Sequence, residues 1–243
     1  MITNIGRQIL RGATKNLRVA SRAPIASRAF TVTPMRFGAG STDGTLTAQL
    51  SNEIKFETES ASPEEPEWVR VFNEEKIWSI EDKAGSDEIV LSRQFGNEFI
   101  RVLFSISDLE QDESAAGQAE EPVDEVPAYS VRMSVSVTKP NSGALTVDCV
   151  SQNESILIDN ISFYKDSKLA TQLTADADWE RRGLYIGPVF EHLDLDVQGE
   201  FQNYLAERGI DERLATFVPE YAVYKEQKEY VKWLDNVKSF IEA

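Results

Sequence analysis

Residues 129–138 read YSVRMSVSVT, and this stretch decides the fold class because apolar and polar side chains alternate along it without a break. Val131, Met133, Val135 and Val137 take one set of positions, while serine, arginine and threonine take the other. Successive side chains of a β-strand point to opposite faces, so this two-residue period predicts a strand with one buried and one polar face. Burial on one face only is typical of antiparallel sheets.

Further strands are expected on both sides of this stretch, separated by short turns that favour antiparallel pairing. They are predicted at residues 76–81, 88–95, 98–107, 145–149, 156–163 and 184–186. With residues 129–138 they make seven strands. Near Asp159-Asn160 the alternation slips by one residue, which predicts a β-bulge there.

Helical spacing replaces the strand pattern at both ends of the predicted domain. Residues 43–60 place Leu46, Leu50 and Ile54 four residues apart, and the proline-containing segment 62–66 ends this helix. Three large apolar residues make a narrow stripe, so we expect the helix to pack on a second helix or on a neighbouring subunit.

Two helices are predicted in the C-terminal quarter. The first covers residues 194–208 and ends at Gly209, and the second starts near Asp211. Pro219 predicts a kink or break in the second helix, or two packing partners, because its apolar stripe changes sides after Lys225. The last stripe is predicted to pack against the N-terminal helix or to contribute to oligomer packing, and it consists of Tyr230, Leu234, Val237 and Ile241.

The N-terminal region is basic and contains no acidic residue before Asp43. Its seven cations are Arg7, Arg11, Lys15, Arg18, Arg22, Arg28 and Arg36. The first five recur every three or four residues and share one helical face, a pattern typical of mitochondrial presequences. The alternative is a basic arm that binds membrane or nucleic acid.

Residues 28–37 resemble a presequence processed in two steps, with cuts after Ala29 and after Phe37. This reading assigns residues 1–37 to the presequence and residues 38–243 to a single acidic domain. Losing residues 1–37 removes seven of the 25 cations and none of the 41 anions, which changes the net charge from −16 to −23. Such a surface repels phosphates and attracts basic proteins.

An acidic segment without any cation separates the third and fourth predicted strands, and we expect it to be a mobile loop over residues 108–127. Its carboxylates are candidate partner-binding residues: Asp108, Glu110, Asp112, Glu113, Glu120, Glu121, Asp124 and Glu125.

The sequence offers little for catalysis or cofactor binding. His192 is the only histidine and Cys149 the only cysteine, so zinc, Cys-His and Ser-His-Asp sites cannot be assembled within one subunit. Cys149 is expected in the core, and His192 at the surface or where a helix begins. No phosphate-binding loop occurs, and the EF-hand-like segment that starts at Asp194 has Leu205 where a bidentate glutamate is required. We therefore expect no catalytic residue, metal ligand or cofactor, and no stretch is apolar enough to span a membrane.

Three short motifs resemble segments of a known protein family. LTVDC (145–149) lies in a predicted strand, YLAERGI (204–210) closes one predicted helix, and EQKEYVKWL (226–234) lies in the last. Together they resemble the mitochondrial acidic matrix protein family, also called the mitochondrial glycoprotein family, whose animal member is the complement component 1q-binding protein. The chain looks like a fungal member.

The resemblance implies an α+β fold: a seven-stranded, highly twisted antiparallel sheet flanked by one N-terminal and two C-terminal helices. It also implies a doughnut-shaped homotrimer with an asymmetric negative surface and no enzymatic activity. Family members are associated with mitochondrial translation, ribosome assembly and oxidative phosphorylation, and bind many cationic partners.

The leading hypothesis is therefore a trimeric acidic adaptor or chaperone of the mitochondrial matrix. It would hold basic proteins, such as ribosomal proteins, through multivalent contacts, with no high-affinity nucleic acid binding. The alternatives are a low-affinity store of divalent cations, a carboxylate-based hydrolase, or charges that serve solubility alone.

Overall fold

The computed structural model describes residues 40–60, 64–111 and 129–243. The chain divides into two units, Met1–Gly40 and Ser41–Ala243, and nearly all described residues belong to the second. The predicted presequence and its processing sites lie outside the described residues.

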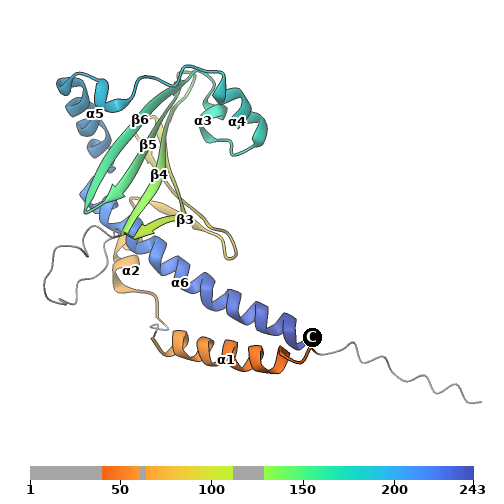
Figure 1. Ribbon diagram of the computed structural model, residues 1–243. Coiled ribbons are helices and arrows are strands. Elements are labelled where there is room, and N and C mark those ends of the chain that lie inside the picture. Colours follow the sequence, from red (N-terminus) through yellow and green to blue (C-terminus); the bar gives the residue numbers. More distant parts are fainter. Residues whose placement is uncertain (1–39, 61–63, 112–128) are drawn as a thin grey trace, which may run out of the picture. The chain divides into compact units, whose positions relative to one another are not determined.

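The described residues contain one antiparallel sheet of six strands, in which each strand pairs with the next along the chain (Figure 1). The strands are β1 (Ser79–Asp82), β2 (Glu88–Phe95), β3 (Glu98–Gln111), β4 (Tyr129–Lys139), β5 (Gly143–Gln152) and β6 (Ser155–Tyr164). The central pairing aligns Val135 of β4 with Val102 of β3 and with Val147 of β5. The predicted α+β fold with an antiparallel sheet is confirmed.

The helices are α1 (Asp43–Ser60), α2 (Glu67–Glu74), α3 (Ser167–Thr171), α4 (Ala175–Arg182), α5 (Leu195–Glu207) and α6 (Glu212–Glu242), with a 3-10 turn η2 (Phe190–His192). Helices α1, α5 and α6 match the predicted ones, and Gly209 follows α5 with a φ of 80°. The short helices α2, α3 and α4 were not predicted from the sequence.

Two strand predictions are wrong. Residues 184–186 do not form a seventh strand; the neighbouring Val189 makes only an isolated bridge to Asn160. The third strand runs to Gln111 instead of ending at residue 107, because its pairing with β4 shifts after Phe104 and resumes at Leu109. The predicted bulge in β6 is confirmed by a register shift that leaves Asp159 without a partner position on β5.

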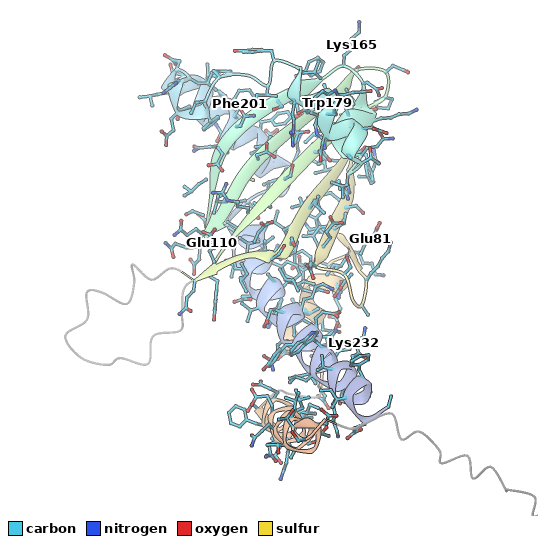
Figure 2. The ribbon with its side chains drawn as sticks, turned by 45° about the vertical axis from the view of Figure 1, so that its right-hand side comes forward. Glu81, Glu110, Lys165, Trp179, Phe201 and Lys232 are labelled. Atoms are coloured by element: carbon cyan, nitrogen blue, oxygen red, sulfur yellow. The ribbon has the colours of Figure 1, made fainter. Side chains whose placement is uncertain are left out.

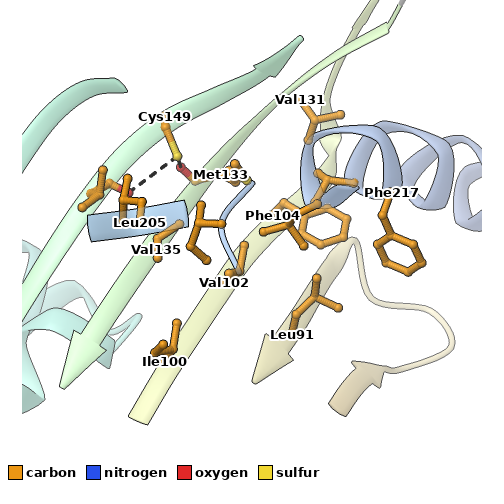
Figure 3. Packing of buried hydrophobic residues seen from close by; sticks show 14 of the residues in the cluster. Leu91, Ile100, Val102, Phe104, Val131, Met133, Val135, Cys149, Leu205 and Phe217 are labelled. Atoms are coloured by element: carbon orange, nitrogen blue, oxygen red, sulfur yellow. Dashed lines mark hydrogen bonds between the residues drawn. The ribbon is translucent and has the colours of Figure 1, made fainter. Parts of the chain in front are cut away.

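The core lies between the sheet and the first half of α6. The apolar positions of the alternating strand are buried, and Phe217 and Val218 of α6 belong to the same cluster as Phe104 and Met133 of the sheet (Figure 3). Cys149 lies in this cluster with 2% of its surface exposed, as predicted. Burial raises the pKa of its thiol, which therefore stays protonated and inert.

Helix α6 continues through Pro219, which excludes a break there and leaves the other predicted alternative, two packing partners. Proline has no N–H, which leaves the carbonyl of Ala215, four residues earlier, without its helical partner. The hydroxyl of Ser151 on β5 donates to that carbonyl at 2.6 Å, and Ser151 is fully buried. The sheet therefore supplies the hydrogen bond that the helix lacks.

The second half of α6 contacts α1 instead of the sheet (Figure 1). Leu50 of α1 and Leu234 of α6 are buried, while Gln227 donates to Glu57 across the pair at 2.7 Å. The stripe of α6 changes sides because its two halves have different packing partners. Ile54, Tyr230, Val237 and Ile241 are half-buried and Leu46 is exposed.

A buried lysine fastens the β1–β2 hairpin to α6. The ammonium of Lys225, only 1% exposed, bonds to the Asp82 carboxylate and to the Lys83 carbonyl. One helical turn later, the Glu229 carboxylate accepts from the Gly85 N–H at 2.9 Å. The hairpin and the helix thus form one connected element.

Candidate binding surface

The face of the sheet opposite α6 carries the polar residues of the alternating strands. Ser134 and Arg132 of β4 point to this outer face, as does Asp148, which pairs with Ser134 across the β4–β5 ladder. A groove of about 430 Å³ runs over the outer face, lined by residues from β2 through β6. We call it the sheet groove, and its polar lining residues are Glu88, Ser105, Asp108, Arg132, Ser134, Asp148 and Asp159.

The sheet groove is acidic, because four carboxylates line it against one guanidinium. Arg132 lies 3.5 Å from Asp159, and both side chains remain more than half exposed. The Ser134 hydroxyl donates to Asp148 at 2.9 Å, which orients that carboxylate without neutralising it. The groove therefore has an excess of negative charge that a cationic side chain can reach from solvent.

Local backbone irregularities place two of these carboxylates. The bulge in β6 puts Asp159 on the outer face, beside Asn160, whose partner is Asp148. Asp108 lies in the part of β3 where pairing with β4 is interrupted. Bulges commonly re-aim side chains near functional sites.

Part of the predicted acidic loop is strand. Asp108 and Glu110 both belong to β3 and are exposed; Asp108 lines the sheet groove, and Figure 2 labels Glu110 near the end of β3. The loop prediction is therefore wrong for residues 108–111. Six predicted partner-binding residues lie outside the described ones: Asp112, Glu113, Glu120, Glu121, Asp124 and Glu125.

A second, more basic groove adjoins the first where α3 and α4 cover the outer face. It has a volume of about 250 Å³, shares Ser134 and Asp148 with the sheet groove, and is lined by Arg101 and Arg181. Arg181 is fixed by a bond to the Gln172 carbonyl at 2.9 Å. Among the described residues, Asp148 is the only carboxylate that lines this second groove, whereas four carboxylates line the sheet groove.

The groove carboxylates Glu88, Asp148 and Asp159 were not named as site residues from the sequence. Asp148 stands between Val147 and Cys149, and the alternation alone places it on the outer face. What the alternation cannot give is the register that sets it next to Ser134 on β4 and near the Asp159 bulge on β6.

Exposed apolar side chains gather along the free edge of β6. The Ile186 carbonyl accepts from Asn160 and Ser162 of β6, so the segment before η2 lies against this edge. Large apolar side chains in this region remain exposed: Leu157, Phe163, Leu184, Tyr185, Ile186 and Val189. Leu157 and Phe163 lie on opposite faces of β6, so these side chains are spread over the edge strand and the segment beside it. Exposed large apolar side chains favour contact with another protein surface.

The single histidine and the groups that could bind a metal ion were the other candidates for chemistry. His192 is exposed at the end of η2. Within residues 40–60, 64–111 and 129–243, no three His, Cys, Asp or Glu side chains are grouped so that they could hold a metal ion. None of the helices in these ranges is long and apolar enough to cross a membrane.

The sequence profile of the mitochondrial glycoprotein family, MAM33, matches residues 50–241, on which the sheet and both grooves lie. The chain belongs to this family. The mitochondrial acidic protein mam33 of Schizosaccharomyces pombe is 31% identical over 245 residues, covering 92% of this chain and 89% of that protein. The mitochondrial complement component 1 Q subcomponent-binding protein of Bos taurus is 26% identical over 176 residues, covering 68% of this chain and 62% of the bovine protein.

Solved structures show the same fold. A Leishmania major protein of unknown function, described as a sequence homologue of human p32, has 27% identity and a TM-score of 0.67, covering 83% of this chain and 99% of its own. The p22 protein of Trypanosoma brucei has 24% identity and a TM-score of 0.65, covering 82% and 98% of the two chains. The family resemblance read from the sequence is confirmed, and the named relatives from yeast and cattle are mitochondrial proteins.

Proposed function

We propose that this member of the mitochondrial glycoprotein family is a non-enzymatic adaptor or chaperone of the mitochondrial matrix that binds basic proteins. The observation that carries the proposal is the sheet groove, with four carboxylates against one guanidinium on an otherwise polar face. The net charge of −16, or −23 without residues 1–37, supports it at the scale of the whole chain.

The chemistry of the groove suits Lys and Arg side chains. A guanidinium or ammonium entering it exchanges water for charge-assisted hydrogen bonds to Asp148, Glu88 and Asp108. All three carboxylates are exposed, so each contact is weak and screened by salt. Useful affinity then requires several contacts at once, as in the recognition of an extended basic surface.

Basic ribosomal proteins fit this requirement, because unpartnered cationic surfaces aggregate on RNA and an acidic holder lowers their effective charge. We therefore propose a role in mitochondrial translation, in ribosome assembly and thereby in oxidative phosphorylation. The bovine relative, the complement component 1 Q subcomponent-binding protein, is named for binding another protein.

We further propose that the chain assembles as a homotrimer. The apolar side chains along the free edge of β6 support self-association, because a lone subunit would expose them to water; Tyr185 alone is 83% exposed. Three copies would present three sheet grooves, and linked grooves bind a multivalent partner far more tightly than one groove does.

Capture of basic proteins from a mitochondrial lysate tests the proposed function. The immobilised full-length chain is expected to retain basic matrix proteins at about 0.1 M salt and to release them as the salt is raised, because the Debye length shortens. Capture that persists unchanged at about 1 M salt would contradict binding through exposed carboxylates.

A further inference from the structure

A second candidate docking surface lies on α5, away from the sheet groove. Val197, Phe201 and Tyr204 recur at helical spacing and form an apolar stripe that is half-buried or exposed. Asp196, Glu200, Asn203 and Glu207 form a parallel polar stripe on the same side of the helix. Together these seven residues line a groove of about 550 Å³, which we call the α5 groove. Figure 2 labels Phe201, one of these residues.

The α5 groove is acidic and apolar at once. Three carboxylates line it, and no Lys or Arg does. The Arg208 guanidinium stacks on the Tyr204 ring with its carbon 3.4 Å from the centroid, and its Nε and one terminal nitrogen donate to the buried Glu98 at 2.7 and 3.0 Å. Its other terminal nitrogen donates to the Tyr204 carbonyl at 2.9 Å and lies 3.7 Å from the Glu207 carboxylate. Arg208 is therefore paired mainly with Glu98 inside the fold and only partly with Glu207, so the three carboxylates still give the groove an excess of negative charge.

The helix that carries the groove is firmly held. The Asp194 carboxylate caps its first turn at 3.0 Å from the Asp196 N–H, and the Gln198 amide bonds to the Leu193 carbonyl at 2.8 Å. Leu205, four residues after Phe201, is buried in the core, and Phe201 and Tyr204 pack partly against the same core. A preformed surface of this kind binds without the entropic cost of ordering it first.

The dimensions of the groove fit a helix. Its lining runs from residue 196 to residue 207, which at 1.5 Å per residue is about 17 Å, or roughly three helical turns. An amphipathic partner helix would place apolar residues on the apolar stripe and Lys or Arg beside the carboxylates.

Charge argues against a second copy of this chain as the occupant. Helices α1, α2, α4, α5 and α6 each contain more Asp and Glu than Lys and Arg. The excess is largest in α1, with four acidic residues against one basic residue, and in α5, with three against none. Packing either of these helices on the α5 groove would bring like charges together, which is unfavourable at an interface.

We propose that the α5 groove binds a basic amphipathic helix of another protein, about three turns long, through apolar contacts to Val197, Phe201 and Tyr204 and ion pairs to Glu200 and Glu207. This site shares no lining residue with the sheet groove. The α5 groove would select partners by the shape of the helix and the spacing of its apolar residues. Exposed carboxylates alone do not provide this selectivity.

Fluorescence anisotropy with two peptides of about 18 residues tests the proposal. One peptide carries leucine along one helical face with arginine on the flanks, and the other has the same composition with the leucines distributed around the helix. The full-length chain is expected to bind the first peptide at least about tenfold more tightly, because only that peptide can fill the apolar stripe.

Variants locate the site. Glu200→Lys with Glu207→Lys is expected to weaken binding of the first peptide by at least about tenfold, and Val197→Ser to weaken it by a smaller factor with no change in charge. Glu180→Lys with Asp235→Lys is the matched control, since it makes the same charge change at exposed positions on α4 and α6. Asp148→Asn with Asp159→Asn, in the sheet groove, is expected to leave the preference between the two peptides intact.

Several results would overturn the proposal: equal binding of the two peptides, equal losses in the α5 and control variants, or unchanged binding in the α5 variants. A change in the mass of the protein, caused by the α5 variants and not by the control, would instead assign this surface to contacts between copies. Circular dichroism of each variant excludes loss of folding as the cause.

Discussion

Ser151 shows how one side chain allows a helix to pass through a proline. Replacing Ser151 with alanine leaves the Ala215 carbonyl buried without a donor, so the free energy of unfolding should fall by about 1–3 kcal/mol. With Pro219→Ala in the same chain the helix regains its own N–H donor, and the cost of Ser151→Ala should shrink. Urea unfolding of both single variants and the double variant measures this coupling; strictly additive losses would contradict it.

Glu98 is the carboxylate most closely tied to its partners in the described residues. Its hydrogen bonds with Arg208 lower its pKa, and Lys139, at 2.9 Å, adds to the effect. A depressed pKa in the folded state stabilises the protein above the pKa of the unfolded state, and this stabilisation is lost as the pH falls through the folded-state value.

Glu98→Gln should therefore lower the free energy of unfolding by about 3 kcal/mol at pH 7, where it leaves Arg208 buried without its carboxylate. The difference from the wild type should narrow as the pH drops below about 4, because Glu98 itself becomes protonated. Urea unfolding across this range tests the assignment, and a difference that stays constant or grows in acid would refute it.

At the scale of single residues, the sequence predicts burial correctly where the two-residue period of a strand determines which face a side chain occupies. Alternation through Val147 and Cys149 buries the cysteine and exposes Asp148. The Glu98–Arg208 pair could not be predicted in this way, because its two residues are 110 positions apart in sequence and meet only after α5 folds against the sheet.

Among the elements, α6 shows what the sequence leaves open. Its two apolar stripes and Pro219 are compatible with a break or with two packing partners, and only the position of Ser151 on β5 decides between them. Helices α2, α3 and α4 have no more than eight residues each, too few for a helical period to stand out. The bulge in β6 was predictable because a slip in alternation is a local signal.

The α1–α6 pair should behave as a unit that depends on its buried leucines. Leu234→Ala should destabilise the protein by about 2–4 kcal/mol, or open α1 locally, because Leu234 is buried where the two helices pack. Leu46→Ala is the matched control and should cost less than about 0.5 kcal/mol, since Leu46 is exposed. Hydrogen exchange should show lost protection in α1 with the sheet retained; equal effects of the two variants would contradict this packing.

At the scale of the whole molecule, the mass of the protein in solution tests the proposed homotrimer directly. Sedimentation equilibrium should give three times the mass of the processed chain, and Tyr185→Lys with Ile186→Lys should shift it toward single subunits by placing charge on the apolar edge of β6. Glu180→Lys, also exposed, should leave the mass unchanged. A wild-type protein that sediments as a single subunit would refute the trimer while leaving the sheet groove in place.

The net negative charge of the molecule can be predicted from the sequence, but the positions of the carboxylates relative to one another cannot. Composition gives the excess of carboxylates, and the alternation predicts which of them lie on the outer face. The sheet groove itself depends on the pairing of β2 through β6 and on two interruptions in register, which bring Glu88, Asp108, Asp148 and Asp159 to one place.

Titration of an arginine-rich peptide into the full-length chain, followed by anisotropy, tests the central claim that a localised acidic groove binds basic partners. Asp148→Asn with Asp159→Asn should weaken binding at least about tenfold, because it removes two of the four groove carboxylates. Glu180→Gln with Asp235→Asn, which makes the same change in net charge at exposed sites on α4 and α6, should leave the affinity within about twofold of the wild type. Equal losses in the two variants would show that only the total charge matters and would contradict the account.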